Sequence, residues 1–128
     1  MRKQYHFRKS AQGLLAWDVD RLVASTAGLV PEAIPLTDIA ELDETYWYDA
    51  EGDAPTGRSI AGHIRLVREA DLSYPVILCP DGRVMDGMHR IVKALVEGHD
   101  TIQAYRLPVL PPPDYVGCDP DALPYGET

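Results

Sequence analysis

The residues with the clearest chemical signature are Gly87, His89 and Arg90, which follow a short apolar segment and open an apolar pattern of helical spacing. The first N–H groups of a helix have no acceptor within the helix and carry the positive end of its dipole. Gly87 has no Cβ, so a ligand can approach the backbone closely. The segment therefore predicts an anion site, to which Met88 contributes only its backbone.

Side-chain charge around this helix start allows two interpretations. Arg90 offers a planar fork of donors suited to phosphate oxygens, and Lys93 follows His89 by four residues on the same side. Positive side chains in a first turn oppose the helix dipole by about 0.3–1 kcal/mol, which a bound anion would relieve. Alternatively, Asp86 caps the helix and Arg90 pairs with a surface acid. Spacing alone does not decide between the two.

The pattern of apolar residues, caps and turns predicts the elements that position this segment. Asp18 and Thr56 are expected helix caps, Asp81-Gly82 a hairpin turn, and Gly98 a helix stop. The expected elements are strand 5–8, a helix from 19, strand 33–36, helix 57–70, strand 75–79, strand 84–86, helix 88–97 and strand 101–107. This order predicts a small α+β domain, a mixed sheet with helices packed on it.

Three further segments carry structural expectations. Residues 43–57 are acidic, aromatic and rich in turn formers, which predicts a mobile loop. The helix after them should bury a stripe of Ile60, Ile64 and Val67. The proline-rich, acidic segment 108–128 should be extended or disordered, or lie over the surface.

Composition bounds the function. The chain has 128 residues and a formal net charge of −8, so it is a poor general binder of duplex DNA, which needs a basic face. No apolar segment is long enough to span a bilayer, and no secretory signal is visible, so a cytoplasmic protein is expected and a membrane partner is not. Cys79 and Cys118 have no metal-site spacing, and no metal centre is expected; Cys79 should be buried.

Residues 75–95 resemble the core of the ParB/sulfiredoxin-like domain. The resemblance rests on Pro75–Leu78, the Asp81-Gly82 turn and the run Asp86–Arg90, and it extends more weakly over residues 34–107. It implies one domain over 1–107 with its core at 34–107, followed by the 108–128 tail. It also implies that Gly87, His89 and Arg90 contact the phosphates of ATP, ADP or CTP.

The sequence also departs from that family. Sulfiredoxins have a reactive cysteine where this chain has Met88, so sulfinate reduction is not expected. Partition-type members have Glu-Arg-Arg after the glycine and hydrolyse CTP; here the run is Met88-His89-Arg90, so that activity is not expected either. The chain given also leaves no room for their helix-turn-helix and dimerisation segments.

The free-serine kinases of the group are the nearest local match, since their segment reads Asp-Gly-His-His-Arg. They use a glutamate from the loop after an early strand as a base. By position this is Glu44, with Glu41 and Asp43 behind it, and a carboxylate there could accept a proton or hold Mg²⁺ through water. Asp86 is the second catalytic candidate. A solvated carboxylate in an acidic loop is the more ordinary interpretation of Glu44.

Other candidates are weaker. Arg58, in the first turn of its helix, could be a second anion contact, and Trp17 or Trp47 could stack on a base. His6 and Arg8 could close over the pocket, although ordinary surface strand residues explain them equally well.

Two functions from different classes remain open. One is a nucleotide-dependent phosphotransferase or hydrolase that acts on a small-molecule or protein acceptor. The other is a non-catalytic module that senses nucleotide or binds a protein, which Met88 and the proline-rich tail favour. A DNA-binding protein or nuclease is disfavoured by the negative charge.

Overall fold

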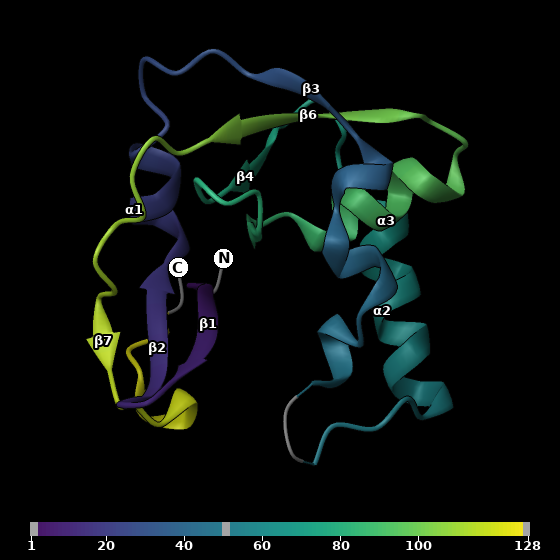
Figure 1. Cartoon of the computed structure of the whole chain (residues 1–128). Helices are drawn as coiled ribbons and strands as arrows, with labels where there is room; N and C mark the ends of the chain where they lie inside the picture. Colours follow the sequence, from purple (N-terminus) through teal and green to yellow (C-terminus); the bar gives the residue numbers. More distant parts are fainter. Residues whose placement is uncertain (1–2, 50–51, 127–128) are drawn as a thin grey trace.

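The computed structural model describes residues 3–49 and 52–126, and it contains two sheets (Figure 1). The first is antiparallel, with strand order β1-β2-β7; the second has order β3-β6-β4-β5 and is mixed, because β4 and β6 run parallel. The strands are β1 (Tyr5–Ser10), β2 (Gly13–Asp18), β3 (Glu32–Pro35), β4 (Val76–Leu78), β5 (Val84–Asp86), β6 (Thr101–Arg106) and β7 (Tyr115–Val116). The predicted α+β class is confirmed.

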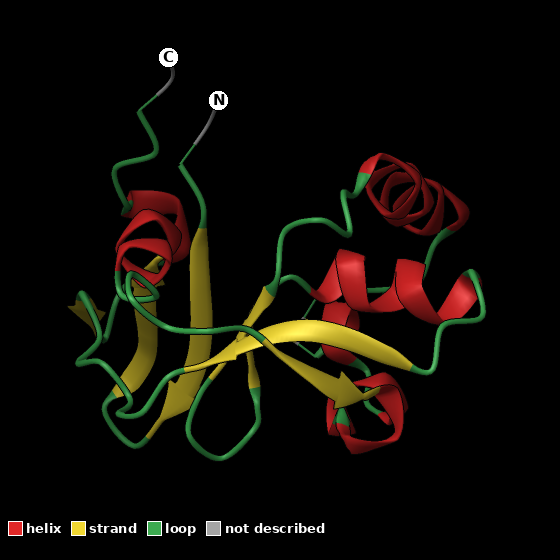
Figure 2. Ribbon diagram, turned by 90° about the horizontal axis from the view of Figure 1, so that it is seen from above, coloured by secondary structure: helices red, strands yellow, loops and turns green. Residues whose placement is uncertain are grey.

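Three α-helices and several 3₁₀ turns complete the described fold. Seen from above, α1 lies with the strands of the first sheet, and the other helices lie at the opposite end of the molecule (Figure 2). The helices are α1 (Val19–Ala24), α2 (Gly57–Glu69) and α3 (Met88–Val96), and the 3₁₀ turns are η1 (Leu36–Asp38), η2 (Ala40–Asp43), η3 (Tyr46–Tyr48) and η4 (Pro120–Ala122). No described helix has the length and apolar character needed to cross a bilayer.

Strand β4 separates two hydrophobic cores. Val76 and Leu78 point into the core beneath α3, whereas Ile77 and the following Cys79 point into the core around Trp17. Successive side chains of a strand alternate between its faces, so a strand covered on both sides reads as a continuous apolar run. The predicted burial of Cys79 is confirmed, at 2% exposed.

Local signals placed most elements correctly. Asp18 caps α1 by accepting from the Asp20 N–H at 2.9 Å, and Thr56 caps α2 by accepting from the Ser59 N–H at 3.2 Å. Gly82 has the positive φ of 84° that its turn requires. The predicted edge strand is β1, at the end of the first sheet.

The expected mobile loop over 43–57 is wrong for its first part. Residues 46–48 form η3, and Tyr46 and Trp47 pack against the core beneath α3. Their aromatic area favours burial over solvent exposure. Residues 50–51 of that expected loop lie outside the described residues.

The buried stripe expected for α2 is also wrong. Ile60 and Ile64 are 42% and 53% exposed, and α2 has no buried residue. The helix packs beside α3 through polar contacts, because Lys93 Nζ donates to the Arg68 and Ala70 carbonyls at 3.0 and 2.6 Å. Since α3 already covers the sheet, α2 lies outside it.

The proline-rich tail lies over the surface of the fold, one of its expected arrangements. Strand β7 pairs with β2, Trp17 Nε1 donates to the Pro111 carbonyl at 2.8 Å, and Leu123 is 8% exposed. Residues 108–126 of the tail therefore pack against the described part of the preceding domain. The expected boundary at residue 107 does not separate two independently packed units. Residues 127–128 lie outside the described residues.

Replacing Gly87 by alanine should destabilise the fold by about 2–4 kcal/mol, measured by urea unfolding. Gly87 has φ +110°, and an added Cβ would lie 2.6 Å from Val76 Cγ1. The control is Gly28→Ala, where φ is +82° but nothing lies within 4 Å, so only conformational strain of about 1–2 kcal/mol is added. Equal losses in the two variants would contradict the close packing.

Candidate functional site

The first turn of α3 opens into a cavity of about 660 Å³, which we call the α3 cavity. Gly87 is the N-cap in a left-handed conformation, and no side chain that the structure describes caps the helix. The side chain of Met88 is 7% exposed and belongs to the core, so this residue offers its backbone alone. The residues of the predicted site that line the cavity are Asp86, Gly87, Met88, His89 and Arg90.

Arg90 is held in place by the protein. Its Nη1 donates to the carbonyls of Tyr74 and Pro75 at 3.0 and 2.9 Å, and its Nη2 donates to Asp86 at 2.7 Å. Asp86 was expected to cap the helix, but it pairs with Arg90 instead. A guanidinium has five N–H groups, so two remain for a ligand.

His89 is not positively charged at neutral pH, in contrast to the expectation from the sequence. Its Nε2 lies 2.9 Å from His63 Nδ1, and Trp47 stacks on both imidazoles with ring centroids 4.7 Å from His89 and 4.1 Å from His63. One ring must accept for this hydrogen bond to form, so the two cannot both be protonated. Burial, reinforced by the neighbouring His63, lowers the pKa of His89 to about 4, and burial also lowers the pKa of His63.

The charge of the α3 cavity differs from the expected one. Three carboxylates line it, those of Glu69, Asp71 and Asp86, against the single guanidinium of Arg90. With His89 uncharged at neutral pH, the ionisable side chains do not make an electropositive pocket. Attraction for an anion comes from the α3 N–H groups, from the remaining donors of Arg90, or from a cation bound with the ligand.

Two predicted basic contacts are not part of this cavity. Lys93 donates to the last carbonyls of α2, where a cation stabilises a helix C-terminus. Arg58 is exposed at the start of α2 and lines neither of the two cavities described here. Lys93 is therefore held away from a ligand at Gly87, and Arg58 lies outside the cavity that such a ligand would occupy.

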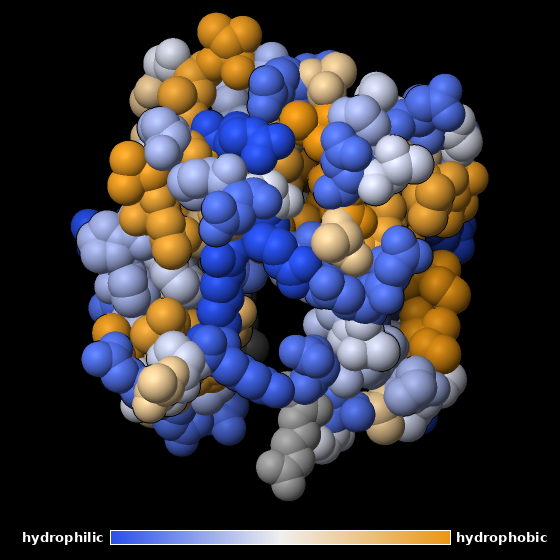
Figure 3. Space-filling view, viewed as in Figure 1, coloured by the Kyte–Doolittle hydropathy of each residue, from blue (hydrophilic) through white to orange (hydrophobic). Residues whose placement is uncertain are grey.

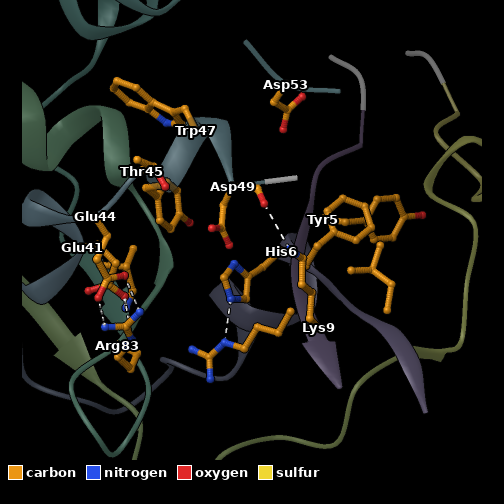
Figure 4. Close-up of a pocket in the computed structure, with 15 residues that line it drawn as sticks. Tyr5, His6, Lys9, Glu41, Glu44, Thr45, Trp47, Asp49, Asp53 and Arg83 are labelled. Atoms are coloured by element: carbon orange, nitrogen blue, oxygen red, sulfur yellow. Dashed lines mark hydrogen bonds and ion pairs between the residues drawn. The ribbon is translucent and has the colours of Figure 1, made fainter. Parts of the chain in front are cut away.

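Glu44 lies in a second cavity of about 800 Å³, which we call the β1 cavity (Figure 4). Its two oxygens accept from Arg83 at 2.7 and 2.8 Å, and this ion pair lowers the pKa of the Glu44 carboxyl. A carboxylate of lowered pKa is a weak proton acceptor. The structure thus does not bring the expected base to the α3 cavity.

The β1 cavity is lined by two of the weaker sequence candidates, Glu41 and Arg8, each of which has a buried polar atom. Glu41 is 2% exposed; its Oε2 accepts from the Val84 N–H at 2.7 Å, and its Oε1 has no hydrogen-bond partner among the described residues. Arg8 Nη2 is likewise buried, and it has no hydrogen-bond partner among the residues that the structure describes. The position of Glu41 between Ile39 and Leu42 is the only sequence signal for its burial.

The protonation of the stacked imidazoles can be tested by NMR titration. We expect His89 to titrate near pH 4, as its low pKa implies, and Trp47→Ala to move this midpoint upward by exposing the ring. Because the folded pKa lies below its ordinary value of about 6.5, the stability contribution is present above that pH and is lost as pH falls toward 4. A midpoint near 6.5 in the native protein would contradict the buried stack.

Comparisons with protein-family models, with curated proteins and with solved structures give no match to this chain. The resemblance to the ParB/sulfiredoxin-like group therefore stays a prediction from the residues quoted above. The described residues form an α+β fold with two neighbouring cavities. The start of α3 and His89 line one of them, and the buried carboxylate of Glu41 lines the other.

Proposed function

We propose that this chain binds the phosphate groups of a nucleotide in the α3 cavity. The observation that carries the proposal is the first turn of α3, which has no side-chain cap and opens into the cavity. N–H groups at a helix N-terminus point outward and carry partial positive charge, so they suit phosphate oxygens. A phosphate would supply acceptors that no described side chain supplies.

Two neighbouring features support this ligand. Gly87 has no Cβ, and Arg90 Nη2 lies 2.9 Å from the position that a Cβ would take, so the guanidinium can lie beside the helix start. The Arg90 guanidinium is fixed by Asp86 and two carbonyls, so little side-chain entropy is lost when its remaining donors bind. The resemblance of Asp86–Arg90 to the ParB/sulfiredoxin-like group favours the same class of ligand, which includes ATP, ADP and CTP.

The carboxylates of the cavity indicate in which form the nucleotide would bind. Glu69 and Asp71 lie in the same cavity as the helix start and would repel a bare polyphosphate. Mg²⁺ bound to the nucleotide neutralises part of that charge, and it is commonly held by one or two carboxylates together with phosphate oxygens. We therefore propose the magnesium complex as the bound form.

Within this proposal, binding without chemistry is the better supported role. Glu44 lies in the other cavity in an ion pair with Arg83, and Asp86 is paired with Arg90. Neither carboxylate is free to take a proton from an acceptor hydroxyl. The favoured function is a nucleotide-sensing module, with a small phosphotransferase or hydrolase as the alternative that a demonstrated turnover would establish.

Calorimetry with ATP, ADP and CTP, each with and without Mg²⁺, tests the proposal. We expect binding of at least one nucleotide, tighter with Mg²⁺. The variant His89→Glu places a negative charge in the first turn of α3 and should weaken binding tenfold or more, which corresponds to about 1.4 kcal/mol.

The matched control is Arg58→Gln, which changes the net charge by the same amount on an exposed helix turn outside the cavity. It should leave affinity within twofold. Equal losses in both variants would mean that only overall charge matters. No binding of any of the three nucleotides to the wild-type protein would overturn the proposal.

A further inference from the structure

Strand β1 has a free edge along most of its length. The carbonyls of Leu14 and Ala16 in β2 accept from the segment that carries β7, so they face away from β1. In an antiparallel pair, the residues opposite such positions also turn their N–H and C=O groups outward. These residues are Lys9 and Phe7, and Tyr5 follows by the same alternation.

These outward backbone groups are unpaired within residues 3–49 and 52–126. No backbone N–H or C=O of Tyr5, Phe7 or Lys9 bonds to any residue that the structure describes beyond the pairing with β2. Unpaired edges of this kind are templates for another strand, and proteins usually cover or shorten them. Here the edge is left open over residues 5–9.

The free edge faces the β1 cavity. All five residues from Tyr5 to Lys9 line it, so the cavity runs along the strand and not across it. Its far wall is formed by Glu41, by residues 44–47 and by Arg83, and Figure 4 shows Glu41, Glu44 and Arg83 across from Tyr5, His6 and Lys9. The space-filling view shows the molecule hollowed between its β1 side and its helical side (Figure 3).

Polar groups inside the cavity lack partners as well. Arg8 Nη2 and Glu41 Oε1 are both buried and make no hydrogen bond within the described chain. A buried donor or acceptor without a partner costs about 1–3 kcal/mol. Both atoms are buried in this structure. If the two side chains turn toward the cavity, an occupant that supplied an acceptor to Arg8 and a donor to Glu41 would remove both costs.

The chain itself shows how an occupant can use this edge. Just before the free stretch, the Lys3 N–H donates to the Tyr125 carbonyl at 3.0 Å. Lys3 faces the same side as Tyr5 by strand alternation, so the C-terminal segment already pairs with the edge for one residue. Beyond that point the edge continues, and no described residue pairs with its outward backbone groups.

We propose that the β1 cavity binds an extended peptide that adds a strand to β1, with an acidic residue of the peptide paired to Arg8. Peptide N–H groups facing away from β1, or a serine or threonine hydroxyl, bond Glu41. The aromatic rings of Phe7, Tyr46 and Trp47 accept apolar side chains from alternate positions.

The test is selection of a phage-displayed library of random octapeptides on the full chain. The best peptides are then synthesised with a fluorescent label and measured by anisotropy. We expect them to share one Asp or Glu between β-branched residues. N-methylation of alternate residues in one register should weaken binding at least tenfold, while the other register tolerates it, because only one set of N–H groups faces β1.

Variants of the protein test the same contacts. Phe7→Pro removes an outward N–H without removing a bond to β2, and Arg8→Gln removes the cation; each should weaken binding at least tenfold, whereas Phe7→Leu should not. Circular dichroism checks that the variants fold. If Phe7→Pro does not fold, the N-methylated peptides test the same backbone contacts on the wild-type chain. No enriched peptide, binding unaffected by N-methylation in either register, or dimerisation of the chain through β1 would each overturn the proposal.

Discussion

The close approach of Gly87 to Val76 is the contact on which the rest of the fold depends. It lets β5 turn directly into α3, so the helix starts against β4, the strand that separates the two cores. Arg90 fastens the same junction by bonding the carbonyls of Tyr74 and Pro75 at the entrance to β4. A side chain at Gly87 would clash with Val76 and push the start of the helix away from the strand.

Sequence patterns predicted the elements whose signals are local. The apolar run of β4 and the helical spacing of α3 follow from burial alone, and Asp18 and Thr56 are recognisable caps. The stripe of α2 misled because a helical pattern shows that a face is apolar but not what covers it. Ile60 thus stays exposed although its spacing is that of a core residue.

The candidate site divides in the same way. The position of Gly87 at a helix start could be read from the sequence, because glycine between a strand and an apolar helical pattern has a local meaning. The partners of Lys93 and Glu44 could not, since long charged side chains reach groups far away in sequence. For Arg90, the sequence allowed a pair with an acid but did not identify Asp86, four residues earlier, as that acid. Glu44 is held by Arg83, 39 residues later, and nothing near either residue indicates the pair.

The two cavities meet at one aromatic side chain. Trp47 lines the β1 cavity and stacks on His89, which lines the α3 cavity, so the ring stack connects the proposed peptide groove to the proposed phosphate site. A ligand in either cavity contacts one end of this stack. This arrangement is compatible with the proposed binding module, because the uncharged side chains of Trp47 and His89 connect its two proposed sites.

The most direct measurement is the amide ¹H–¹⁵N spectrum of the protein during titration with ADP and Mg²⁺. The account predicts the largest shifts at the backbone N–H groups of Met88, His89 and Arg90, the uncapped first turn of α3. Shifts confined to residues outside the α3 cavity, or no shifts at millimolar nucleotide, would contradict it.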